Sequence, residues 1–154
     1  AVDPNPERLK RAAEFGATHF VNPNDGDSVA QVKELTGGGA DFVFEATGNT
    51  NVMRQALEST IYGGGVCCLV GVAKTGEVVQ VTPRLLIAGR KLIGTAFGGC
   101  RGKSQLPQLI DWYMEGKVKV DELITKVIPL SEINEAFASM KKDSGYRYVI
   151  DYNL

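Results

Sequence analysis

The sequence is poor in the residues that bind metals or form disulfides. It contains one histidine, His19, and three cysteines, Cys67, Cys68 and Cys100. Adjacent residues of a strand point to opposite faces and the cysteine count is odd, so we expect no disulfide framework, as in a reducing cytoplasm. Closely spaced cysteines and histidines of the kind that bind zinc are also missing. We therefore predict no metal ligand and no catalytic residue in this chain, and we interpret His19 as a surface or packing residue.

Charge and hydropathy exclude two kinds of partner. The net charge of -1 lacks the basic excess that is typical of nucleic-acid binding. No apolar run approaches the roughly 20 residues that a membrane-spanning helix needs. We expect neither nucleic acid nor membrane as a partner. No basic stretch followed by an apolar segment indicates a secretory signal, so a cytoplasmic location is expected.

A phosphate-binding glycine loop is missing as well. The clusters "GGGADF" and "GGGVCC" contain neighbouring glycines but lack the spacing of GxGxxG, and neither leads from a strand into a helix. The backbone donors that usually hold a dinucleotide pyrophosphate are therefore not found in this sequence.

What is present is an alternation of apolar strands and amphipathic helices, which is typical of βαβ units and predicts an α/β fold. Phe42, Val43 and Phe44 form a run that is apolar on both faces, which predicts a central parallel strand covered by helices on both sides. The expected strands after the opening "AV" are 18–22, 41–48, 63–72, 77–81, 91–99, 123–130 and 146–152, and the clearest expected helix is 104–116.

The first residues resemble the end of a strand that runs into a helix, with Asn5 as its cap and Pro6 at its first position. At the end of the second strand of a dinucleotide-binding fold, a carboxylate such as Asp3 accepts hydrogen bonds from both hydroxyls of an adenosine ribose and disfavours a 2′-phosphate. The alternative interpretation is that Asp3 is only an exposed charge at a strand end.

Three apolar strands end in small turns that contain glycine: "FEATG" at 44–48, "LVGV" at 69–72 and "TAFGG" at 95–99. Ligands of open α/β sheets bind beyond the carboxyl ends of the strands, and small residues there let a ring or a ribose approach the backbone. One such turn would only end a strand, but the three together favour a ligand crevice.

In order along the chain, the sequence resembles the C-terminal portion of a zinc-dependent medium-chain alcohol dehydrogenase, near the class III, thiol-dependent formaldehyde dehydrogenase type. The segments that carry the resemblance are "VDPNPERLKRAAEFGATHFVNP", "GGGADFVFEATG", "LVGV", "GRKLIGTAFGG", "LITKVIPLSEINEAF" and "YRYVI". The resemblance implies a partial Rossmann-type, doubly wound parallel sheet that lacks its first strand and glycine loop. These would precede residue 1 together with a zinc-bearing catalytic domain, so we interpret the chain as a fragment.

The resemblance also implies NAD as the cofactor, with zinc only in the intact family. Asp3 would bind the adenosine ribose with Arg8 beside it, although the family commonly has a lysine at that position. Arg147 would bind the pyrophosphate, or else be a solvent-facing arginine of its strand. The residues implied at the nicotinamide end are Ala46, Thr47, Val70, Val72, Ala96 and Phe97.

The implied activity is hydride transfer between NAD and a small alcohol or aldehyde. Residues 1–120 would form the truncated NAD-binding domain, and residues 121–154 would return to the catalytic domain. The strand at 91–97 would join two copies into a homodimer. Two alternatives stay open: a zinc-free, NADP-dependent quinone reductase of the same superfamily, which Asp3 disfavours, and a non-catalytic assembly module.

Overall fold

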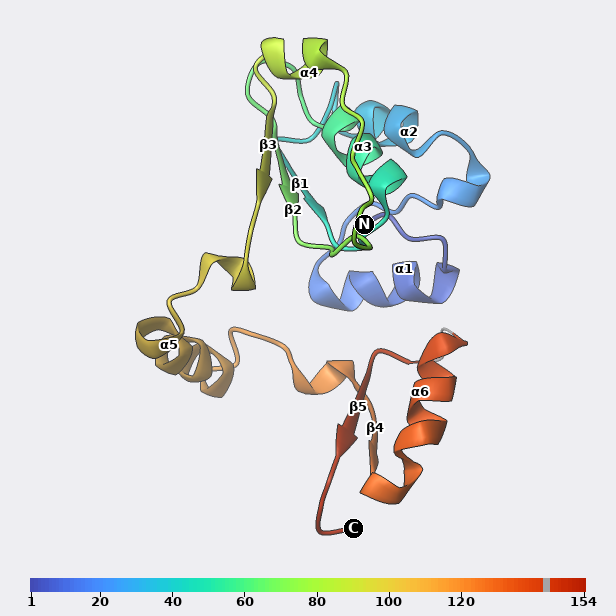
Figure 1. Cartoon of the computed structure of the whole chain (residues 1–154), viewed down its shortest axis with the longest axis vertical. Coiled ribbons are helices and arrows are strands. Elements are labelled where there is room, and N and C mark those ends of the chain that lie inside the picture. The colour runs from blue at the N-terminus through green and yellow to red at the C-terminus, as the bar shows by residue number, and fades with distance from the viewer. Residues whose placement is uncertain (143–144) are drawn as a thin grey trace. The chain divides into compact units, whose positions relative to one another are not determined.

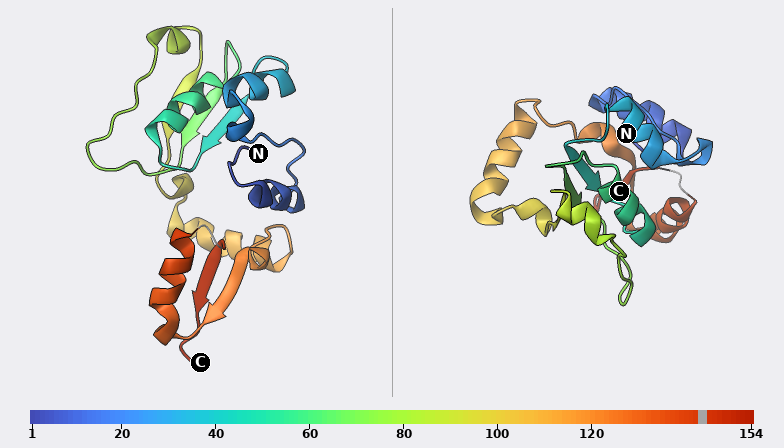
Figure 2. Two further views of the ribbon diagram at one scale, coloured as in Figure 1. Left: turned by 90° about the vertical axis from the view of Figure 1, so that its right-hand side faces the viewer. Right: turned by 90° about the horizontal axis from the view of Figure 1, so that it is seen from above.

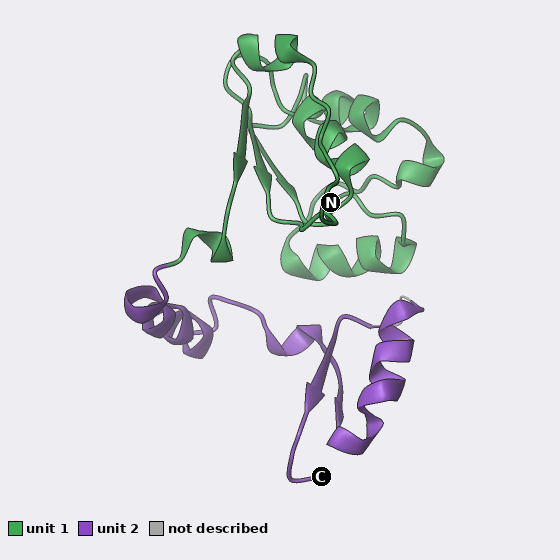
Figure 3. Cartoon of the chain, viewed as in Figure 1, with its two compact units in different colours: residues 1–100 green, residues 101–154 purple. Residues whose placement is uncertain are grey.

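The computed structural model describes residues 1–142 and 145–154 of the chain. Its contacts separate into two compact units, Ala1–Cys100 and Arg101–Leu154, which Figure 3 colours separately and which are described one at a time below. The domain division predicted at residue 120 concerns the intact protein and stays a prediction.

The first unit carries most of the alternating elements. Its helices are α1 (Pro6–Ala12), α2 (Ser28–Leu35), α3 (Thr50–Glu58) and α4 (Pro83–Ile87), and its strands are β1 (Phe42–Glu45), β2 (Val66–Leu69) and β3 (Lys91–Gly94). Short 3₁₀ turns lie at Ala13–Phe15, Pro23–Asp25 and Phe97–Gly99.

The three strands form a parallel sheet in the order β1-β2-β3 (Figure 1). Phe42 lies opposite Val66 in the first pair, and Val66 lies opposite Lys91 in the second. Parallel neighbours joined by helical crossovers are the α/β architecture that the strand and helix pattern predicts, so the predicted fold class is confirmed.

One face of this sheet is covered by helices. Helix α3 packs on β1 and β2, and α2 packs beside α3, as Figures 1 and 2 show. The core between α3 and the strands contains Ala56, Leu57 and Cys67, and Val43 is among the residues packed against it. Leu57 and Cys67 are fully buried, so this layer holds the sheet in place.

The opposite face of β1 corrects one expectation. Phe42 and Phe44 alternate with Val43 and therefore lie on the other side of the strand. They are 68% and 71% exposed, so the prediction of helical cover on both faces is wrong for this chain. The physical reason is that β1 is an edge strand of its sheet and the helices that contact it lie on the Val43 side.

Two further predicted strands differ in the structure. The segment 18–22 is reduced to one parallel bridge, between Val21 and Val2, because its partner is only the short stretch Ala1–Asp3. The segment 77–81 forms no strand, since no neighbouring strand pairs with it among the described residues. Val81 packs against the core while Val78 is exposed, so the apolar alternation there reflects a partly buried loop.

The second unit contains helix α5 (Gly102–Met114), strand β4 (Ile124–Ile128), helix α6 (Ile133–Lys141) and strand β5 (Arg147–Ile150). Strands β4 and β5 pair in parallel. Helix α5 confirms the helix predicted at 104–116, with its bounds shifted by two residues. Its apolar side chains at Leu106, Leu109, Ile110, Tyr113 and Met114 are exposed. Among the described residues, no helix has the length and apolar character needed to cross a membrane.

The burial of Cys67 leads to a prediction about thiol reactivity. Burial, followed by the nearby Cys68 and Glu45, raises the pKa of the Cys67 thiol to about 11. Only the thiolate is alkylated, so at pH 8 we expect iodoacetamide to modify Cys67 on the order of a hundredfold more slowly than the partly exposed Cys100. Peptide mapping by mass spectrometry measures both rates. Equal rates in the folded chain would contradict this account, whereas in urea the difference should disappear.

Candidate functional site

The candidate site lies at the carboxyl edge of the sheet, where β1, β2 and β3 end. Because all three strands are parallel, the turns that follow them meet at this one edge. The turns are Ala46–Gly48 after β1, Val70–Val72 after β2, and Ala96–Gly99 after β3. This is the place where open α/β sheets bind their ligands.

The turn after β1 is held by the carboxyl group of Glu45. Its Oε1 atom accepts hydrogen bonds from the backbone N–H of Thr47 at 2.6 Å, from the Thr47 hydroxyl and from the backbone N–H of Gly48 at 3.1 Å. The turn therefore bends back over the end of its own strand. Asn49 then caps α3, accepting hydrogen bonds from the backbone of Asn51 and Val52.

The turns after β1 and β2 touch each other backbone to backbone. A Cβ atom added to Gly48 would collide with the backbone carbonyl of Val72, and one added to Gly71 would collide with the backbone nitrogen of Gly48. Gly48 also has a φ of +76°, which disfavours any side chain. Neither glycine can be replaced without moving the other turn.

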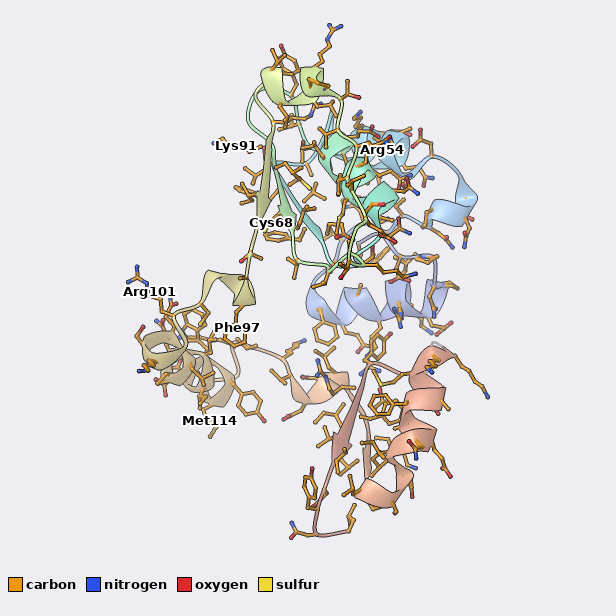
Figure 4. All side chains as sticks on the ribbon, in the orientation of Figure 1. Arg54, Cys68, Lys91, Phe97, Arg101 and Met114 are labelled. Carbon is orange, nitrogen blue, oxygen red and sulfur yellow. The ribbon has the colours of Figure 1, made fainter. Side chains whose placement is uncertain are left out.

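The turn after β3 is left-handed. Phe97 has a φ of 52° and is followed by Gly98 and Gly99, whose φ values are 65° and 69°. A non-glycine residue in this region carries a conformational cost. Phe97, labelled in Figure 4, is 80% exposed, so its side chain is presented at the end of β3 without support from the core.

The predicted ribose-binding residue, Asp3, is placed by its neighbours. Its Oδ1 atom accepts a hydrogen bond from the backbone N–H of Asn5 at 2.8 Å, and its Oδ2 atom lies 3.9 Å from a guanidinium nitrogen of Arg8. The backbone N–H of Asp3 donates to the carbonyl of Val21 at 3.2 Å. Asp3 is thus fixed at the end of the short parallel bridge.

A pocket of about 1040 Å³ lies between that bridge and β1. Asp3 and Arg8 line it on one side, and Glu45, Ala46 and Thr47 line it on the other. Side chains of α2 and α3 also contribute to its walls. The structure therefore brings the predicted ribose residues and part of the predicted nicotinamide end to one pocket.

The remaining predicted residues are placed as follows. Val70 and Val72 are exposed on the turn that contacts Gly48, and Ala96 lies beside Phe97 at the end of β3. Arg147 is the first residue of β5 in the second unit, and its side chain is exposed there. His19 is exposed, and its Nδ1 atom lies 2.9 Å from the Thr18 hydroxyl, in agreement with the interpretation as a surface residue.

Sequence reasoning missed Glu45. The signal that could have found it is a single acidic residue at the end of the apolar stretch "FVFE", directly before a glycine turn. An acidic side chain that is buried at the end of a strand needs hydrogen-bond partners, and here the following turn supplies them.

Among residues 1–142 and 145–154, no group of three or more His, Cys, Asp or Glu side chains is arranged to hold a metal ion. These residues by themselves therefore do not fit a zinc ion.

Comparison with known proteins gives consistent results. The protein-family model described as "zinc-binding dehydrogenase" matches residues 1–115. The chain is 44% identical to the class-3 alcohol dehydrogenase of Cereibacter sphaeroides and 42% identical to the S-(hydroxymethyl)glutathione dehydrogenase of Paracoccus denitrificans. These alignments cover 97% and 98% of this chain but 42% of each relative.

Solved structures agree with the sequence relatives. The crystal structure of benzyl alcohol dehydrogenase from Acinetobacter calcoaceticus superimposes with a TM-score of 0.90 at 32% identity, over 97% of this chain and 41% of that chain. An alcohol dehydrogenase zinc-binding domain protein from Burkholderia ambifaria superimposes with a TM-score of 0.89 at 32% identity, over 96% of this chain and 40% of that one. The chain thus spans about two fifths of the length of the proteins that it matches.

The contact between the two glycine turns leads to a stability prediction. Replacing Gly48 with alanine would place a Cβ against the carbonyl of Val72 in a left-handed residue, so we expect the free energy of unfolding to fall by more than about 2 kcal/mol. Gly64→Ala is the matched control, because Gly64 has open space around it and no left-handed φ. Urea denaturation measures both variants, and an equal, small loss in the two would contradict the close contact.

Proposed function

The chain belongs to the zinc-binding dehydrogenase family, and on this premise we propose that it is the NAD-binding portion of an enzyme that transfers hydride between NAD and an alcohol or aldehyde. The observation that carries the proposal is the carboxyl edge of the parallel strands, where Asp3 follows the short bridge between Val2 and Val21 and small, glycine-containing turns follow β1 and β2. The relatives named as class-3 alcohol and S-(hydroxymethyl)glutathione dehydrogenases support this reaction class.

Each proposed contact follows from the chemistry of the residue. The Asp3 carboxylate would accept hydrogen bonds from the adenosine ribose hydroxyls, and the guanidinium of Arg8 would flank the same sugar. Arg147 would pair with the pyrophosphate, which suits a permanently charged planar group. NAD, when bound, supplies the hydride acceptor, and this chain orients it.

The nicotinamide would lie over the turns at the ends of the strands. Ala46 and Thr47 follow β1, Val70 and Val72 follow β2, and Ala96 and Phe97 follow β3. Small or exposed residues at these positions leave backbone groups open to the carboxamide. The turns after β1 and β2, which contact each other at Gly48 and Gly71, would give the nicotinamide a fixed surface. A fixed surface of this kind aligns the reacting carbon with the substrate.

We also propose how the rest of the intact protein completes this chain. A further parallel strand with its glycine loop would fill the pocket between Val2 and β1, and the helix that follows this loop would cover Phe42 and Phe44. Residues 1–120 would then form the NAD-binding domain, and residues 121–154 would return to a catalytic domain that holds zinc. Strand β3, an edge strand with Ile93 exposed, would pair two copies into a homodimer.

The preference for NAD over NADP is tested by changing Asp3 in the full-length protein. In the Asp3→Gly variant, the ribose hydroxyls lose a charged acceptor and a 2′-phosphate loses its repulsion, so the ratio of kcat/KM for NAD to that for NADP should fall at least about tenfold. The control is Asp25→Gly, an exposed aspartate outside the pocket. If the unchanged enzyme uses both cofactors equally well, the proposed role of Asp3 is wrong.

The isolated chain provides a second test. Without a GxGxxG loop in its sequence, it lacks the backbone donors that hold a pyrophosphate, so NAD should bind no more tightly than about millimolar. No alcohol-dependent reduction of NAD is expected. Calorimetry and absorbance at the wavelength of NADH measure these two properties. Micromolar affinity for NAD, or turnover by residues 1–154 alone, would contradict the proposal that the pyrophosphate loop and the catalytic groups lie in the rest of the intact protein.

A further inference from the structure

Glu45 is the buried acidic residue to which none of the proposed contacts assigns a role. It ends the apolar strand β1, is 2% exposed and lines the large pocket. A buried carboxyl group costs free energy unless hydrogen bonds compensate for its lost hydration. The hydrogen bonds that Glu45 makes therefore indicate which part of the structure it stabilises.

Glu45 joins the turns after β1 and β2. Its side chain accepts hydrogen bonds from Thr47 and Gly48, as described above. Its backbone carbonyl accepts two more, from the N–H groups of Val70 at 2.7 Å and Gly71 at 2.9 Å. One residue thus fixes the backbone of both turns that touch each other at Gly48 and Gly71.

The second carboxyl oxygen of Glu45 also faces this junction. Oε2 is buried and has no hydrogen-bond partner among the described residues. It lies so close to Gly71 that a Cβ atom there would be 2.7 Å from it. The absence of a side chain at position 71 is therefore what leaves room for the carboxyl group.

We propose that Glu45 is a positioning residue for the nicotinamide half of NAD. Its carboxyl group would hold Ala46–Gly48 in the conformation that contacts Val70–Val72 and so fix the surface on which the nicotinamide lies, while Asp3 binds the other half of the cofactor independently. The inference rests on the proposed function. It adds a residue that acts through the two turns and does not itself need to touch the cofactor.

The test uses the full-length protein with a Glu45→Gln substitution. Glutamine keeps the shape of the side chain, but its neutral amide oxygen is a weaker acceptor and its NH₂ group replaces Oε2 with a donor. We expect the Kd for NAD to rise about tenfold, while the Kd for ADP-ribose, which lacks nicotinamide, changes less than twofold. Isothermal titration calorimetry measures both constants.

Two further variants make the test specific. Glu58→Gln is the matched control, since Glu58 pairs with Arg54 on α3 and does not line the large pocket. Thr47→Val removes the hydroxyl that donates to Glu45 and keeps the side-chain volume. If the two residues act through this bond, the double variant should bind NAD about as weakly as Glu45→Gln alone. Thr47→Val also carries the test if Glu45→Gln does not fold, and it should then show the same selective loss of NAD binding.

The outcomes are distinct. A loss of NAD affinity with unchanged ADP-ribose affinity supports the positioning role. Equal losses for both ligands would mean that Glu45 serves the stability of the sheet alone, and unchanged affinities would mean that the turns do not depend on it; either result overturns the inference and leaves the proposed function intact. If the unchanged full-length protein binds no NAD, the proposed function and this inference both fail.

Discussion

The backbone contact between Gly48 and Gly71–Val72 is the constraint on which the candidate site depends. Two turns that follow neighbouring parallel strands can approach this closely only where both lack a side chain at the point of contact. Once they touch, the end of β1 and the end of β2 become one rigid edge. Glu45 accepts hydrogen bonds from both turns at this edge. Its carboxyl group accepts from Thr47, and its backbone carbonyl accepts from Val70 and Gly71.

This constraint explains why exposed residues can form a site at all. Val72 and Phe97 have almost no packing that would fix their side chains, and an exposed loop normally has little reason to adopt one conformation. Here the backbone is held by the sheet through strand ends, glycine contacts and the carboxyl group of Glu45. The left-handed conformation of Phe97 at the same edge costs free energy. The pairing of β3 with β2 must compensate for this cost.

Local chemistry made part of this arrangement predictable from the sequence. The cap at Asn5, the helices and the glycine turns depend on residues close together in the chain, and the structure agrees with them. The exposure of Phe42 and the loop at 77–81 depend instead on what lies beside a strand, and apolar runs do not carry that information. The burial of the Glu45 carboxyl group depends on the approach of Gly71, which lies far along the chain, and this is why the sequence alone did not indicate it.

The exposed face of β1 connects stability with cofactor binding. Burying a phenylalanine contributes about 1.5–3 kcal/mol, so covering Phe42 and Phe44 would be worth roughly 3–6 kcal/mol in total. The proposed strand would occupy the pocket lined by Asp3 and Thr47, and the helix after its glycine loop would supply this cover. The segment that brings the pyrophosphate loop would then be the same segment that completes the core. On this account, the cofactor site forms only as far as the sheet itself is completed, and binding of NAD reports on folding of the whole domain.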